Sequence, residues 1–117
     1  MRNPSVLLAF VLALAACAGE PKPSPSDSAR GVVALQTYGC GACHRIPGVA
    51  GANGIVGPPL DHLRRQVYIA GRLPNNAENM VRWIRAPQAI VPQSVMPDMQ
   101  VTQDDATAMT AYLRSLE

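Results

Sequence analysis

The stretch Cys40-Gly41-Ala42-Cys43-His44 decides how the rest of this sequence is interpreted. It has the C-x-x-C-H spacing of a c-type haem attachment site. Two thiols at this spacing reach the two vinyl groups of one porphyrin and form thioethers with them, and the next residue then lies under the iron. The motif therefore predicts one covalent haem c, attached through Cys40 and Cys43, with the neutral imidazole of His44 as an iron ligand.

Three other roles of a C-x-x-C pair compete with haem attachment. A thioredoxin-like redox site is expected within a βαβ pattern, and none is recognisable around this motif. A zinc site needs more ligands, but the sequence has no second Cys pair and only one other histidine, His62. A plain disulfide is the third alternative in an oxidising compartment. Export favours haem attachment, because c-type maturation takes place outside the cytoplasm.

The amino-terminal region predicts export and a lipid anchor. Arg2 precedes an unbroken apolar run over residues 6–16, which is too short to span a bilayer and is typical of a signal peptide. The run ends in Leu14-Ala15-Ala16-Cys17, which resembles the lipobox of bacterial lipoproteins. We expect residues 1–16 to be removed and Cys17 to become a lipidated terminus facing the periplasm or the cell exterior. The alternative is an ordinary signal peptide that contains a cysteine.

The remainder divides into a linker and one domain. Residues 19–28 read G-E-P-K-P-S-P-S-D-S, a Pro/Ser-rich composition typical of an extended linker. We therefore expect anchor and linker over residues 17–28 and a single domain over residues 29–117. Loss of Arg2 with the signal leaves nine of the ten basic residues against eight acidic ones. This balance argues against non-specific binding to nucleic acid.

Helical periodicity dominates the domain and predicts an all-α class. We expect helices over about residues 27–38, 75–86 and 102–116, with a short helical turn over residues 60–65. Asn75 and Thr102 are the predicted N-caps of the second and third helices. Residues 41–60 and 87–98, which are rich in Gly and Pro, are predicted to be loops. No segment has the pattern of a strand.

From about residue 29 to residue 116 the chain resembles a class I cytochrome c domain. More narrowly, it is similar to the cytochrome c domain at the carboxyl end of subunit II in some bacterial cytochrome c oxidases. The resemblance is carried by G-P-P-L at 57–60, I-A-G-R-L-P-N-N at 69–76 with E-N at 78–79, W-I-R-A-P-Q-A-I at 83–90 and V-M-P at 95–97. It implies a small fold of helices around one covalently bound haem. Because no copper-binding domain precedes it here, we expect a free-standing lipoprotein.

The resemblance also implies roles for individual residues. The carbonyl of Pro58 would accept a hydrogen bond from the imidazole of His44, and Leu60 would pack against the haem. Arg65 would lie near a haem propionate, the alternative being a solvated surface arginine. Trp83 would face the haem pocket, the alternative being an ordinary core aromatic. Gly31 matches the small residue where the first helix crosses the last near Tyr112, the alternative being a loop glycine.

For the sixth iron ligand the resemblance favours Met96, which is followed by proline as in the family. Met99 and His62 are weaker candidates, and His62 is more typical of a surface histidine. Met80 and Met109 lie in predicted helices and are expected in the core. A thioether ligand favours ferrous iron and so raises the reduction potential.

With both axial positions filled, the sequence predicts an electron carrier rather than an enzyme. The resemblance implies a membrane-tethered carrier of single electrons in a respiratory chain, with a terminal cytochrome oxidase as partner. The alternatives are an electron-transfer subunit of a dehydrogenase complex, a gas-binding or peroxidase-like haem protein, and a haem-free thiol–disulfide protein.

Overall fold

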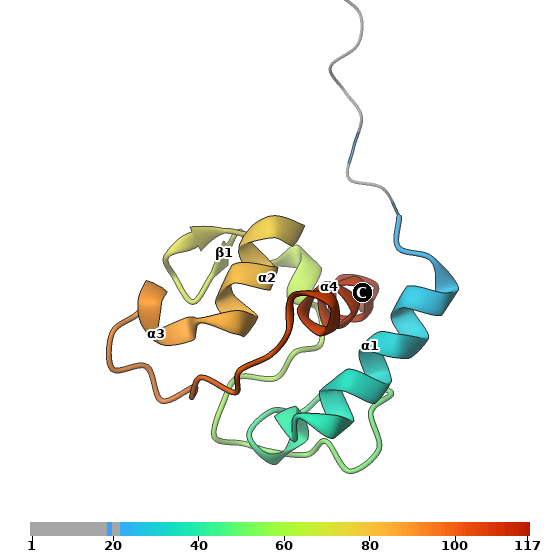
Figure 1. Ribbon diagram of the computed structural model, residues 1–117, viewed down its shortest axis with the longest axis horizontal. Helices are drawn as coiled ribbons and strands as arrows, with labels where there is room; N and C mark the ends of the chain where they lie inside the picture. The colour runs from blue at the N-terminus through green and yellow to red at the C-terminus, as the bar shows by residue number, and fades with distance from the viewer. Residues whose placement is uncertain (1–18, 20–21) are drawn as a thin grey trace, which may run out of the picture.

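The computed structural model describes residues 19 and 22–117, so the predicted signal peptide and Cys17 lie outside the described residues. The described part is predominantly helical, which confirms the all-α class (Figure 1). Its elements in chain order are α1 (Pro25–Thr37), the 3₁₀ turns η1 (Cys40–Ala42) and η2 (Leu63–Arg65), the strands β1 (Tyr68–Ile69) and β2 (Leu73–Pro74), and the helices α2 (Ala77–Arg85), α3 (Pro87–Ile90) and α4 (Gln103–Leu113).

Helix α1 begins two residues earlier than the sequence predicted. Ser24 is its N-cap, and the Ser24 hydroxyl accepts a 3.2 Å hydrogen bond from the backbone N–H of Asp27. Pro25 occupies the first helical position, where a proline costs no hydrogen bond because that N–H has no helical partner. Residues 25–28 therefore belong to the helix and not to the predicted linker.

Helix α2 is capped by Asn76 and not by Asn75. The Asn76 side chain accepts a 2.8 Å hydrogen bond from the backbone N–H of Asn79. The side-chain amide of Asn75 instead reaches across the fold and donates to the carbonyls of Leu63 at 2.7 Å and Gln66 at 2.8 Å. Two consecutive asparagines give equal capping signals in the sequence, and only the tertiary contacts distinguish them.

A short hairpin of two strands and a short helix appear where no regular structure was predicted. Strands β1 and β2 pair antiparallel around a tight turn, in which Ala70 and Gly71 both have positive φ angles, 51° and 66°. Arg72 N–H closes the turn on the carbonyl of Ile69 at 2.9 Å, as in the type I′ turns that suit hairpins. Two residues per strand are too few to give an alternating pattern. Helix α3, within the predicted loop over residues 87–98, starts at Pro87.

Helices α1 and α4 cross closely at Gly31. A Cβ atom on Gly31 would lie 2.2 Å from the carbonyl oxygen of Ala108 and 2.8 Å from the Cβ of Tyr112. Because no side chain fits there, only glycine lets the two backbones approach to this distance. The predicted crossing near Tyr112 is confirmed, and the loop-glycine alternative is wrong.

The hydrophobic core lies between α1, α2 and α4. Met80 and Met109 are almost completely buried, which confirms their predicted place in the core. Other buried members are Leu35, Ile46, Ile69, Ile84, Val101, Ala106 and Leu113. None of the helices in the part of the chain that the structure describes is both long and apolar enough to cross a membrane.

Candidate functional site: a haem-binding cavity

The C-x-x-C-H segment folds into one compact turn. The N–H groups of Cys43 and His44 both donate to the carbonyl of Cys40, at 3.2 and 3.0 Å. Gly39, just before the turn, has a positive φ of 70°. Both thiols, together with the imidazole, line a single cavity. The local fold therefore gathers two thiols and one imidazole at the same wall.

The His44 imidazole is oriented by Pro58, as the sequence resemblance implied. The Nδ1 atom lies 2.7 Å from the Pro58 carbonyl oxygen. Because a carbonyl can only accept a hydrogen bond, Nδ1 carries the proton and Nε2 keeps a free lone pair. This is the tautomer that a metal ligand bound through Nε2 requires.

The backbone of Gly57 packs closely against the His44 imidazole. A Cβ on Gly57 would lie 2.3 Å from Cε1 and 2.7 Å from Nδ1 of His44. The Gly57 N–H also donates to the carbonyl of Cys43 at 2.8 Å. Gly57 is the first residue of the G-P-P-L stretch, and no role was predicted for it from the sequence. The structure shows that a residue without a side chain is needed here to bring the Pro58 carbonyl to the imidazole.

A second pair of contacts holds the segments after His44 and Pro58 together. Leu60 N–H donates to the carbonyl of Arg45 at 2.9 Å, and the Arg45 guanidinium forms a 2.8 Å ion pair with Asp61. Because the Arg45 side chain is 58% exposed, this ion pair contributes about 1 kcal/mol at most. Its main consequence is geometric, since Leu60 is held in the cavity wall.

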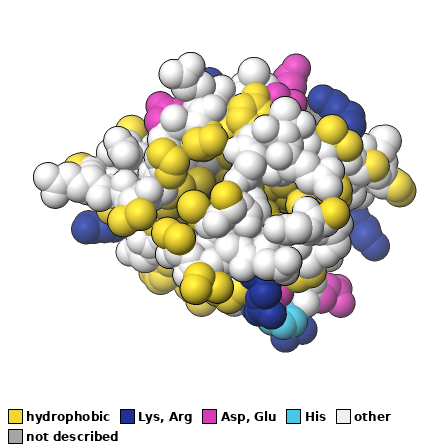
Figure 2. All heavy atoms as spheres, turned by 90° about the horizontal axis from the view of Figure 1, so that it is seen from below, with side chains coloured by type: hydrophobic (Ala, Val, Ile, Leu, Met, Phe, Trp, Pro, Cys, Tyr) yellow, Lys and Arg dark blue, Asp and Glu magenta, His cyan; other side chains and the backbone are white. Residues whose placement is uncertain are grey.

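The cavity has a volume of about 530 Å³ and is mostly apolar. No Asp, Glu, Lys or Arg side chain occurs among its described lining residues. Figure 2 shows a hollowed face of the molecule with hydrophobic side chains in and around the hollow and charged ones toward the edge. The apolar lining includes Leu35, Leu60, Leu63, Ile69, Met80, Trp83, Ile84, Met96, Met109 and Leu113. A large apolar cofactor with thiol and imidazole attachment fits this wall chemistry.

Most of the other predicted site residues also reach the cavity. Leu60, Trp83 and Met96 are half-buried and line it. Met99 lines it as well but is 43% exposed. The structure does not bring Arg65 into the lining: Arg65 lies exposed at the end of η2, and the next residue, Gln66, lines the cavity instead.

His62, the remaining candidate for an iron ligand, is exposed and does not line the cavity. Several polar residues that do line it were not singled out from the sequence, namely Tyr38, Gln66, Tyr68 and Ser94. Only Tyr38 gave a local signal, because it lies two residues before the motif. Gln66 is brought to the cavity by the end of η2, Tyr68 by the hairpin and Ser94 by the loop after α3.

The surroundings of the thiols favour thioether formation over thiol–disulfide exchange. Burial raises the pKa of the Cys40 thiol above its ordinary value, and the nearby Cys43 adds to the rise. A thiol–disulfide enzyme needs the reverse, a thiolate stabilised at neutral pH. A neutral thiol suits thioether formation, in which S–H adds across a vinyl group.

Nowhere in residues 19 and 22–117 do three or more His, Cys, Asp or Glu side chains form a metal-binding cluster.

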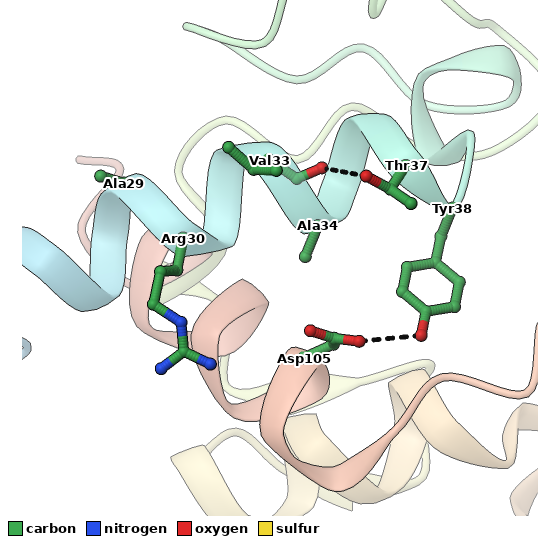
Figure 3. A pocket seen from close by; sticks show the side chains of 7 residues that line it. All are labelled: Ala29, Arg30, Val33, Ala34, Thr37, Tyr38 and Asp105. Carbon is green, nitrogen blue, oxygen red and sulfur yellow. Dashed lines mark hydrogen bonds between the residues drawn. The ribbon is translucent and has the colours of Figure 1, made fainter.

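A second, more open hollow of about 370 Å³ lies beside α1 and the start of α4 (Figure 3). The Tyr38 phenol donates to Asp105 at 2.9 Å, and the Thr37 hydroxyl donates to the carbonyl of Val33 at 2.8 Å. Tyr38 is shared with the larger cavity. Because these polar groups already have partners within the protein, the larger cavity is the candidate functional site.

Comparison with known proteins agrees with this site. The sequence profile of the cytochrome c family matches residues 28–117, and the chain belongs to that family. It is also similar to cytochrome c oxidase subunit 2 of Alkalihalophilus pseudofirmus, with 34% identity over 110 residues. The matched region covers 93% of this chain and 31% of the relative, so the chain spans about a third of that protein's length.

Membership of this family defines the cofactor and the class of activity. The chain carries covalently bound haem c, attached through the Cys40 and Cys43 pair, and acts as an electron carrier. The haem supplies an iron that gains and loses one electron. The protein supplies the thiols that fix the cofactor, the imidazole held by Pro58 and the apolar walls that keep water away from it.

Proposed function

We propose that this cytochrome c is a membrane-tethered electron carrier whose iron is ligated by His44 and Met96, and that it delivers electrons to a terminal oxidase. The observation that carries the ligand assignment is that Cys40, Cys43, His44 and Met96 line the same cavity. The two axial candidates come from segments far apart in the sequence. The turn after α1 supplies His44, and the loop between α3 and α4 supplies Met96.

The wall chemistry supports an iron with both axial positions filled. Met96 would offer a neutral, soft thioether, which stabilises ferrous iron and raises the reduction potential. The absence of charged side chains from the described lining works in the same direction, since an apolar site disfavours the extra positive charge of ferric iron. Trp83 and Leu60 would pack on the haem and exclude water.

The ligand assignment is tested by visible spectroscopy of the haem-loaded protein. We expect sharp reduced bands that carbon monoxide does not change, and a weak far-red iron–thioether band in the oxidised form. Met96→Ala should abolish the far-red band and let carbon monoxide bind. Met99→Ala, the matched control in the same loop, should leave both unchanged. Carbon monoxide binding to the unaltered protein would instead indicate an open iron and a gas-binding or peroxidase-like function.

Tethering through a lipid on Cys17 rests on the lipobox and the apolar run before it. Several acyl chains on one cysteine would hold the protein firmly on a bilayer, because each buried CH₂ contributes about 0.8 kcal/mol. Cells fed labelled palmitate should yield a labelled protein in the membrane fraction. Cys17→Ala should remove the label and release the haem protein, whereas Gly19→Ala should change neither. Unlabelled, freely soluble protein would contradict the tether.

Delivery to an oxidase is supported by the similarity to an oxidase subunit. A tether keeps the carrier at a high effective concentration near membrane partners. The reduced protein, added to membranes of its source, should be oxidised rapidly by oxygen, and cyanide should block this oxidation. If it is instead reduced by a dehydrogenase substrate and co-purifies with the catalytic subunit, the alternative role in a dehydrogenase complex is the correct one.

A further inference from the structure

Residues 91–102, here called the distal loop, join α3 to α4 and carry Met96 (Figure 1). We propose that Arg85 and Ser94 are positioning residues that hold the distal loop in place and so set how readily Met96 leaves the iron. Neither residue would touch the iron. The inference rests on the proposed role of Met96, and the experiment below separates failure of one from failure of the other.

The start of the distal loop is held by two side-chain contacts. The Ser94 hydroxyl accepts a hydrogen bond from the backbone N–H of Met96 at 3.3 Å. The side-chain amide of Gln88, on α3, donates to the carbonyl of Ser94 at the same distance. Both bonds are long and therefore individually weak. Ser94 also lines the haem cavity, so its hydroxyl fixes the backbone at the point where the Met96 side chain branches off.

The end of the distal loop is held by Arg85, the last residue of α2. Its Nη1 donates to the side-chain oxygen of Gln103 at 2.8 Å, and its Nε donates to the carbonyl of Val101 at 3.3 Å. Val101 is only 5% exposed and anchors the loop in the core. Because α2 also supplies Met80 and Trp83 to the cavity wall, Arg85 fixes the loop relative to that wall.

The backbone of the distal loop contains two residues in an unfavourable conformation. Gln93 and Gln100, on either side of Met96, have positive φ angles of 66° and 54°. Side chains other than glycine disfavour this region, and such residues persist only where the surrounding structure enforces them. The hydrogen bonds that Arg85 and Gln88 donate, and the one that the Ser94 hydroxyl accepts, are contacts that can enforce this conformation.

Loss of one of these contacts should release Met96 more often without disturbing haem attachment. None of the three side chains is bonded to the C-x-x-C-H turn. Each bond links a side chain to backbone or amide, so its removal should shift the ligation equilibrium by roughly three- to tenfold. The shift is measurable because added imidazole competes with a methionine ligand for ferric iron.

The experiment compares four variants of the haem-loaded protein at one neutral pH. Ser94→Ala and Arg85→Gln remove the proposed contacts. Ser115→Ala and Arg82→Gln are matched controls, because the Ser115 hydroxyl donates to the carbonyl of Tyr112 and the Arg82 guanidinium to Asn79 on its own helix, both away from the distal loop. Imidazole affinity is read from loss of the far-red band, and the thermal midpoint of each variant is recorded in parallel.

We expect Ser94→Ala and Arg85→Gln to bind imidazole about three to ten times more tightly than the unaltered protein, and both controls to bind it equally. Unchanged imidazole affinity in both test variants, whatever their thermal midpoints, would overturn the positioning role and leave the Met96 assignment intact. Absence of the far-red band from the unaltered protein would overturn the Met96 assignment itself, and the positioning role with it.

Discussion

The Tyr38 phenol donates a 2.9 Å hydrogen bond to the carboxylate of Asp105, which lies 67 residues further along the chain. The same carboxylate accepts from the Thr102 hydroxyl at 2.8 Å, while the Asp105 backbone N–H donates to that hydroxyl. This reciprocal arrangement caps α4. Since Tyr38 lies two residues before Cys40 and lines the haem cavity, Asp105 connects the first turn of α4 to the haem attachment segment.

Asp105 should make stability depend on pH in the acid range. The Thr102 hydroxyl, then Tyr38 and the charge of Arg30, lower the pKa of Asp105 from its ordinary value of 3.8. Because the pKa of Asp105 is lower in the folded protein than in the unfolded chain, its carboxylate stabilises the fold. This stabilisation is fully present above the unfolded pKa and is lost as the pH falls through the folded pKa. Asp105→Asn should therefore lower the urea midpoint at pH 7, and the difference from the unaltered protein should shrink at the acid end.

The control for this experiment is Asp104→Asn, because Asp104 lies in the same first turn of α4 and has an exposed side chain. Both carboxylates favour the positive end of the helix dipole, but only Asp105 has the bonds to Thr102 and Tyr38. An equal loss of stability in the two variants would show that the dipole alone is responsible.

Gly31→Ala should destabilise the protein through the crossing of α1 and α4. Its methyl group would lie 2.2 Å from the carbonyl oxygen of Ala108, and backbone atoms cannot move aside as a flexible side chain could. Forcing apart a packed contact of this kind costs about 1–3 kcal/mol. Denaturant unfolding of the haem-loaded protein measures the loss. Val33→Ala, at a site 62% exposed on the same helix, should change little.

Tyr112→Phe should weaken the contact between α4 and the loop after His44. The Tyr112 hydroxyl donates to the carbonyl of Pro47 at 2.5 Å, and loss of such a bond costs about 1 kcal/mol. Burial raises the pKa of Tyr112 in the folded protein above the unfolded value of 10.0. The contribution of the neutral phenol to folding stability is therefore present below pH 10.0 and is lost as the pH rises through the folded pKa. Urea midpoints measured at increasing pH should fall less steeply for Tyr112→Phe. An identical decline of the urea midpoint in both proteins would contradict a contribution of the Tyr112 phenol to this pH dependence.

The haem attachment site was predictable because its chemistry is local. C-x-x-C-H places three groups within five residues, and the structure keeps all three at one cavity wall. The hydrogen bond between His44 and Pro58 was implied by the resemblance. These two residues are 14 positions apart in the sequence, and the His44 Nδ1 lies 2.7 Å from the Pro58 carbonyl oxygen. The role of Gly31 was likewise implied by the resemblance, and the loop-glycine alternative was excluded only when the structure placed Gly31 within α1 against α4.

The wrong N-cap was predicted where two neighbouring residues carry similar local signals. Asn75 and Asn76 are both good N-caps. The Asn75 side chain instead donates to the carbonyls of Leu63 and Gln66, and the sequence does not indicate that these carbonyls lie near it. Gln66, the neighbour of Arg65, lines the cavity without having been singled out from the sequence, whereas the propionate role of Arg65 stays a prediction. The roles proposed for Arg85 and Ser94 depend on contacts between separate segments, and no spacing in the sequence indicates them.

Gly57→Ala tests whether the backbone behind His44 controls the iron ligand. The added methyl group would lie 2.3 Å from Cε1 of the imidazole, so we expect the ring to tilt and its 2.7 Å bond to Pro58 to lengthen. That bond makes the imidazole a stronger donor, which favours ferric iron. We therefore expect Gly57→Ala to raise the reduction potential, with a loss of stability of about 1–3 kcal/mol from the clash. Gly19→Ala, where a Cβ has no neighbour within 4 Å, should leave both quantities unchanged. A lower stability with an unchanged potential would mean that the clash is relieved by the backbone of residues 54–57, and that the His44 imidazole keeps its position against the Pro58 carbonyl.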